Sequence, residues 1–173
     1  PRLSLGLMSP RVTAIVVVHS GFGRDGSDHL SSTLTALGEQ SRRPDRLVVV
    51  ATGPPDTVLD TAPAFAPTQL VTAPDSLPFG AAIALAMRSL PDVAADELLW
   101  FLAQDSVPRP DALRTLVGAL ETAPSVAIAA PKVLDGNDPS MIASFGQSIT
   151  RFGARVDLVT DEMDQGQHDD SSD

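Results

Sequence analysis

Asp105 is the residue whose position in this chain most clearly indicates chemistry. It comes after Gln104 and the uninterrupted apolar run Leu98–Ala103, and Ser106 and Pro108 follow it. An apolar run without a polar face predicts a strand buried on both sides, as in a parallel sheet covered by helices. Ligands of open α/β sheets bind beyond the carboxyl ends of such strands. Asp105 is therefore expected to ligate a divalent cation or to handle a diphosphate; the alternative is a carboxylate that caps the next turn.

A second group of polar residues ends the apolar segment Val12–His19. His19 and Ser20 lie where backbone donors and a hydroxyl suit a nucleotide, and an ordinary polar strand end is the alternative. The histidines at 19, 29 and 168 lack metal-ligand spacing. The glycines at 21, 23 and 26 lack the acidic residue that completes a dinucleotide fingerprint, and the chain has no Walker phosphate loop or nucleophile elbow. Dinucleotide-dependent and serine-hydrolase chemistry are therefore disfavoured.

Composition bounds the class of protein. A chain of 173 residues with 43% apolar content is expected to fold, and 15 prolines and 12 glycines predict many turns. The net charge of −10 argues against nucleic acid as a partner, because phosphate backbones need Lys and Arg. The absence of cysteine excludes disulfides and fits a cytoplasmic setting. No apolar run reaches the roughly 18 residues of a membrane span. Both ends are expected to be cuts in a longer chain, so any membrane association would come from its missing parts.

These residues must be positioned by elements that alternate along the chain. Short apolar runs predict strands, and apolar residues spaced three or four apart predict helices. The predicted strands are Val12–His19, 47–51, 69–72, Leu98–Ala103 and 126–130; the predicted helices cover 30–37, 79–90 and 110–120, and a glycine-rich loop covers 21–26. Strands that alternate with helices favour an α/β fold, with a mostly parallel sheet and helices on both faces.

The pattern changes after residue 131. Residues 143–159 place apolar side chains between glycines, which predicts a C-terminal β-ribbon. Residues 160–173 are polar and acidic, and are expected to form an acidic loop or a disordered end. The sequence therefore predicts one domain over residues 11–159, followed by this acidic segment.

Four motifs, in this order, carry a resemblance to a known family. They are Thr-Gly at 52–53, Pro-Phe-Gly-Ala-Ala at 78–82, Trp-Phe-Leu-x-x-Asp-Ser-x-Pro-x-Pro-Asp-Ala-Leu at 100–113 and Ala-Pro-Lys-Val at 130–133. Together they resemble the family 2 glycosyltransferases, whose GT-A fold is a Rossmann-like, mostly parallel sheet. The run at 164–169 resembles large actinobacterial members whose catalytic domain precedes many membrane spans. The resemblance covers residues 11–173 and implies an incomplete domain.

The resemblance implies transfer of a sugar from a nucleotide-diphosphate donor to a cell-envelope glycan or lipid-linked acceptor. Mg²⁺ or Mn²⁺ would bridge the diphosphate, at the cytoplasmic face of the membrane. Asp105 would be the metal ligand, and Gln167 and His168 would belong to a substrate loop. The catalytic base would lie beyond the C-terminus, so the isolated 173 residues are expected to be inactive. The donor-binding residues that the resemblance implies are His19, Ser20, Thr52, Gly53, Gly80 and Gln104.

Three positions depart from the family pattern. Ala51 stands where an Asp usually holds the base, Ile83 where an Asn is expected, and Ala103 where the metal motif has another carboxylate. These departures favour a second hypothesis, a degenerate, non-catalytic glycosyltransferase-like binding domain. A third hypothesis is a nucleotidyltransferase, which also places carboxylates at strand ends. The absence of a Gly-rich phosphate loop bearing Lys or Arg near the first strand disfavours it.

Overall fold

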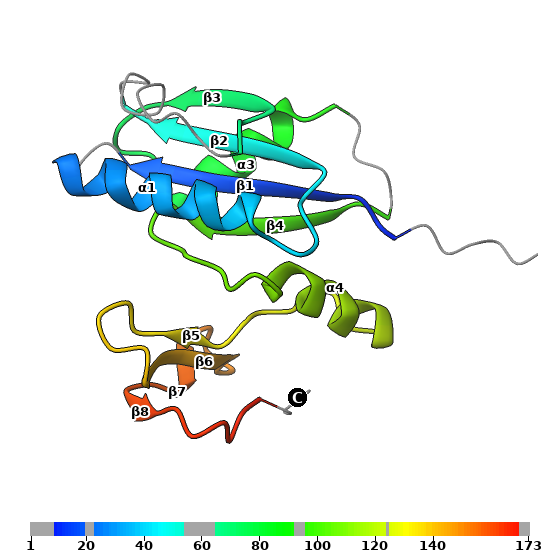
Figure 1. Ribbon diagram of the computed structural model, residues 1–173, viewed down its shortest axis with the longest axis vertical. Helices are drawn as coiled ribbons and strands as arrows, with labels where there is room; N and C mark the ends of the chain where they lie inside the picture. Colours follow the sequence, from blue (N-terminus) through cyan, green and yellow to red (C-terminus); the bar gives the residue numbers. More distant parts are fainter. Residues whose placement is uncertain (1–8, 20–22, 54–64, 92–95, 124, 170–173) are drawn as a thin grey trace, which may run out of the picture. The chain divides into compact units, whose positions relative to one another are not determined.

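The computed structural model describes residues 9–19, 23–53, 65–91, 96–123 and 125–169 (Figure 1). The chain divides into two compact units, one up to Leu113 and one from Arg114 onward. We call them unit 1 and unit 2. The domain expected over residues 11–159 spans both.

Unit 1 is built on a four-stranded parallel sheet in the order β3-β2-β1-β4. The central position of β1 explains its composition, because all of residues 12–18 are buried. In the register, His19 lies opposite Thr52 and Val17 lies opposite Ala103, so three strands end at the same edge. The strands are β1 (Val12–His19), β2 (Arg46–Thr52), β3 (Gln69–Ala73) and β4 (Leu98–Ala103).

Helix α1 (Gly23–Gly38) covers one face of this sheet (Figure 1). Its apolar stripe of Leu30, Leu34 and Leu37 is fully buried, as the spacing predicts. The stripe packs in one cluster with alternate residues of the strands, among them Ala14, Val16, Leu47 and Val49. Burying a leucine side chain contributes about 1.5–3 kcal/mol, so this face is a major source of stability.

Helix α3 (Phe79–Ser89) covers the opposite face. A second cluster joins Ala82, Ile83 and Ala86 to the strand side chains on this face of the sheet. These strand residues alternate with those of the first cluster and include Ile15 and Val48. The expected α/β fold, with a parallel sheet between helices, is therefore confirmed. Ile83, which departs from the family pattern, is only 8% exposed and serves this core.

Two expectations about strands are wrong. β4 is not buried on both sides: in the described sheet it pairs with β1 alone, and Phe101 is 46% exposed. The run at 126–130 is not a strand, and Ile128 is 83% exposed. An apolar run becomes a strand only when a neighbour satisfies its backbone groups, and the run itself does not specify that neighbour. Gly23 and Gly26 also lie within α1 instead of the expected loop.

Unit 2 contains most of α4 (Ala112–Thr122) and four short antiparallel strands. β6 is the central strand of this group and pairs with the other three. Residues 160–169, expected to be loop or disordered, form β8 and a loop after it. In the described parts of the chain, no helix has the length and apolarity of a membrane span. The strands are β5 (Val133–Leu134), β6 (Met141–Ile149), β7 (Arg155–Val159) and β8 (Glu162–Met163).

Candidate functional site

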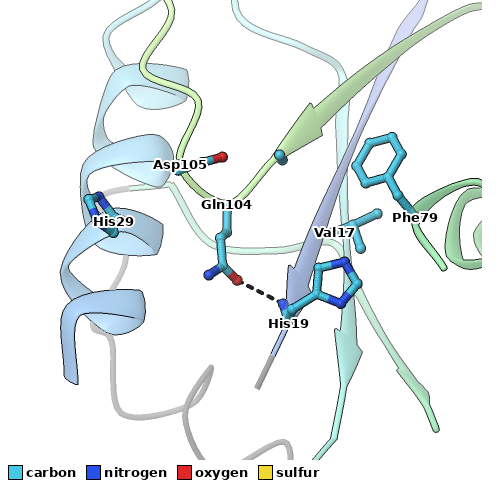
Figure 2. Close-up of a pocket in the computed structure, with 7 residues that line it drawn as sticks. Val17, His19, His29, Phe79, Gln104 and Asp105 are labelled. Carbon is cyan, nitrogen blue, oxygen red and sulfur yellow. Dashed lines mark hydrogen bonds between the residues drawn. The ribbon is translucent and has the colours of Figure 1, made fainter. Parts of the chain in front are cut away.

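A pocket of about 270 Å³ opens at the carboxyl ends of β1 and β4 in unit 1 (Figure 2). Its walls come from these two strands, from α1 and from the start of α3. Ligand pockets usually measure about 300–1,000 Å³, so this one has room for part of a nucleotide-sized molecule. The lining residues are Val17, His19, His29, Phe79, Ala103, Gln104 and Asp105.

Gln104 holds three elements together at this pocket. It is 5% exposed, and its Oε1 accepts a hydrogen bond of 2.8 Å from the backbone N–H of His19 (Figure 2). Its own carbonyl accepts a hydrogen bond of 2.6 Å from the buried hydroxyl of Thr33 on α1. The two bonds fasten the end of β4 to β1 and to α1. The sequence predicts that Gln104 binds the donor. In the structure, its Oε1 is engaged in a hydrogen bond within the protein.

Thr52 and Gly53, also predicted to bind the donor, end β2 beside the pocket-lining His19. The Thr52 hydroxyl lies 2.9 Å from His19 Nδ1 and 3.2 Å from the carbonyl oxygen of Val18. Thr52 is 1% exposed, so its hydroxyl is available to the imidazole and not to a ligand. Gly53 has φ = 108°, which favours glycine, and its N–H donates to the carbonyl of Ala73. Both residues position the strand end.

Asp105 is exposed at the pocket and lies within the tight turn in which the Ser106 N–H donates to the Ala103 carbonyl. No hydrogen bond joins its carboxylate to another described residue, so a capping role for Asp105 has no support there. An exposed carboxylate without a partner at the rim of a pocket is available to a ligand.

A resident metal ion does not fit the residues around Asp105. Ala103 offers no ligand atom, and the described residues contain no group of three or more His, Asp or Glu side chains that could hold a metal. Magnesium is often bound by one or two carboxylates together with substrate phosphates. Asp105 can therefore contribute one ligand to a cation that arrives with a diphosphate.

Three lining residues, Val17, His29 and Phe79, were not predicted from the sequence. Phe79 is the first residue of α3 and is 40% exposed. The helix has no side-chain cap, since Pro78 at the N-cap makes none, and its first-turn N–H groups are suited to an anion. His29 precedes Leu30, the first residue of the buried stripe of α1. The helical spacing that begins at Leu30 could have indicated the neighbouring His29. Phe79 could have been identified as part of the motif at 78–82.

Gly80 is not among the described lining residues. Gly80 follows Phe79, and no atom of another part of the chain lies within 4 Å of where a Cβ would be. Ser20 lies outside the described residues. Gln167 and His168 belong to unit 2.

In unit 2, side chains of the loop at 164–169 contact Lys132, Phe145 and Glu162 of the same unit. Gln167 Nε2 donates to Glu162 Oε1 at 2.6 Å, and the His168 ring stacks on Phe145 with centroids 4.7 Å apart. Lys132 Nζ binds both Asp164 and Asp169. The hydrogen bonds that Lys132 donates to these carboxylates raise its pKa. The polar cluster that suggested a substrate loop is thus largely paired internally.

Comparison with known proteins adds no relative to this description. No protein-family model matches the chain, and no curated protein matches it. The chemical capacity of the pocket therefore rests on its geometry: an apolar wall, two imidazoles, an uncapped helix start and one free carboxylate.

Proposed function

We propose that this chain supplies the donor-binding part of a glycosyltransferase. The enzyme would move a sugar from a nucleotide-diphosphate donor to a glycan or lipid-linked acceptor. One observation carries the proposal: the pocket with His19, Phe79 and Asp105 lies at the carboxyl edge of a parallel sheet, where α/β folds bind nucleotides. The motif resemblance implies the reaction, and the position of the pocket at this edge supports a donor site there.

The lining side chains suit a ligand in which a planar group is joined to an anion. Val17, Phe79 and Ala103 offer an apolar wall suited to a base. No Lys or Arg is among the described lining residues, so the diphosphate would rely on the first turn of α3 and on a cation shared with Asp105.

A degenerate binding domain is the second candidate, and Ala103 favours it. This residue lines the pocket where another carboxylate would strengthen a metal site. Such a domain would bind nucleotide-diphosphate sugars independently of a divalent cation, or would not bind them.

Calorimetric titration of the full chain separates these candidates. Nucleotide-diphosphate sugars are titrated with Mn²⁺ or with a chelator, into wild type, Asp105→Asn and the control Asp75→Asn. Asp75 is an exposed acid outside the lining, so its loss changes net charge equally. We expect Mn²⁺-dependent binding that weakens by about tenfold in Asp105→Asn alone, as for loss of a metal-site group.

Two other results are decisive. Binding that ignores both the chelator and Asp105→Asn supports the degenerate domain instead of the enzyme. Failure of every nucleotide-diphosphate sugar to bind would overturn the donor-site proposal.

A further inference from the structure

Thr52 has one hydroxyl hydrogen and two neighbouring acceptors. Its Oγ1 lies 3.2 Å from the Val18 carbonyl oxygen and 2.9 Å from His19 Nδ1. A carbonyl oxygen only accepts, whereas the imidazole nitrogen donates or accepts according to its tautomer. The protonation of His19 therefore decides how many of these contacts are hydrogen bonds.

The two neutral tautomers differ in this count. With hydrogen on Nδ1, His19 donates to Thr52 Oγ1, and the Thr52 hydroxyl donates to Val18. With hydrogen on Nε2, Nδ1 must accept the single hydroxyl hydrogen, and the Val18 contact loses its donor. The contact that would be lost is buried, since Thr52 is 1% and Val18 7% exposed, and buried polar groups normally keep their hydrogen bonds. The Nδ1–H tautomer makes both bonds and is the one that the surroundings favour.

We infer that Thr52 holds His19 in the Nδ1–H tautomer, so that Nε2 presents a hydrogen-bond acceptor to the pocket ligand. His19 lines the pocket together with Val17 and Phe79. In Figure 2, the His19 ring lies near Val17, on the side of β1 where Phe79 lies. The backbone N–H of His19 is already bound to Gln104, which fixes the residue from its other end. His19 is thereby a specificity-determining residue, and Thr52 is a positioning residue that acts through it.

The lone pair on Nε2 selects the class of ligand, a step that rests on the proposed function. A nucleobase with a ring N–H, such as uracil, thymine or guanine, donates to this nitrogen. Cytosine and adenine carry a ring lone pair at the corresponding position and would set two acceptors against each other. A site built to hydrogen-bond one group discriminates strongly against an analogue lacking it, because a polar group is left unpaired.

The tautomer is measured first, without any ligand. Long-range ¹⁵N–¹H correlation spectra, taken at about pH 8 where histidine is normally neutral, distinguish a protonated ring nitrogen from one with a lone pair. The His19 signals are assigned by their loss in His19→Phe. We expect hydrogen on Nδ1 in wild type and in Thr52→Ser, and a mixture of tautomers in Thr52→Val. Hydrogen on Nε2 in wild type overturns the inference.

Base preference is measured second, with the same protein. UDP is compared with CDP, and GDP with ADP, because each pair differs at the ring position in question. We expect the ring N–H member to bind at least tenfold tighter in wild type and Thr52→Ser. The preference should shrink toward unity in His19→Phe and decrease in Thr52→Val, while the control Asp75→Asn, at an exposed residue outside the lining, keeps it.

The outcomes separate the two proposals. If nucleotides bind but wild type shows no preference within either pair, His19 does not read the base and the donor-site proposal survives. If no nucleotide binds, the donor site and its specificity fall together, while the spectra still decide the tautomer.

Discussion

Thr33 and Gln104 show how single polar residues hold the pocket. The Thr33 hydroxyl is fully buried and bridges from α1 to the carbonyl of Gln104, and it also contacts the carbonyl of His29. A buried carbonyl that loses its donor costs more than the bond itself contributed, because water cannot replace the partner. The wall between His29 and Gln104 therefore depends on one hydroxyl.

Thr33→Val tests this dependence, since valine keeps the shape and removes the donor. We expect a loss of about 1–2 kcal/mol in the free energy of unfolding. Urea unfolding followed by Trp100, the chain's single tryptophan, reports on β4. Thr35→Val is the control: the same substitution on the same helix, at a residue whose side chain bonds to no other described residue. Equal losses in the two variants would show that exchanging a hydroxyl for a methyl group on this helix, and not the Gln104 bond, sets the cost.

At the residue scale, strand-end positions were easier to predict than helix positions. Gln104 and Asp105 follow an unbroken apolar run, so their place at a sheet edge followed from the sequence. His29 and Phe79 come from helices, whose distance to that edge depends on packing across the sheet. The hydrogen bonds of Gln104 were also out of reach, because they join residues 71 and 85 positions apart.

Among the helices and strands, too, some features follow from the local sequence and others from distant neighbours. β1 and β4 have the predicted bounds, because each is a short and mainly apolar run. The helical stripe of α1 was likewise encoded by its own spacing. The burial of β4 and the state of residues 126–130 depended on which strand lies alongside, and no local pattern specifies that neighbour.

The loop after β8 is held by the side chain of Lys132. This residue is the only lysine of the chain. Its side chain is 14% exposed and binds Asp164 and Asp169, which raises its pKa above 10.5. A raised folded-state pKa means that the stabilisation is complete below the unfolded-state pKa. It is lost as the pH rises through the folded-state pKa.

We therefore expect Lys132→Met to lower the stability of this loop at neutral pH, with a difference from wild type that fades above about pH 10.5. Amide hydrogen exchange at residues 164–169 measures the neutral-pH difference, and alkaline unfolding measures its pH dependence. The chain has no Tyr or Cys, so no other side chain of ordinary pKa titrates between about pH 9 and 12. A difference that persists unchanged above that range would assign the effect to packing of the lysine stem.

Across the whole molecule, the buried apolar side chains are distributed unevenly. In the described residues, Val117 and Ile142 are the only buried apolar residues of unit 2, whereas unit 1 holds two full clusters around its sheet. Unit 2 instead exposes Ile149, Phe152 and Leu158 on its hairpin. Hydrophobic burial is the dominant favourable term in folding, so the two units should differ in local stability.

Native-state hydrogen exchange should reveal this difference directly. Amides of β1 and β2 are surrounded by both clusters and should open only with unfolding of the whole sheet, whereas those of β6 and β7 should open locally. We expect protection factors at least tenfold larger in β1 and β2. Within β6, the amides near the fully buried Ile142 should exchange more slowly than those near the exposed Ile149. Equal protection in the two units would mean that the antiparallel strands derive their stability from something other than their own apolar burial.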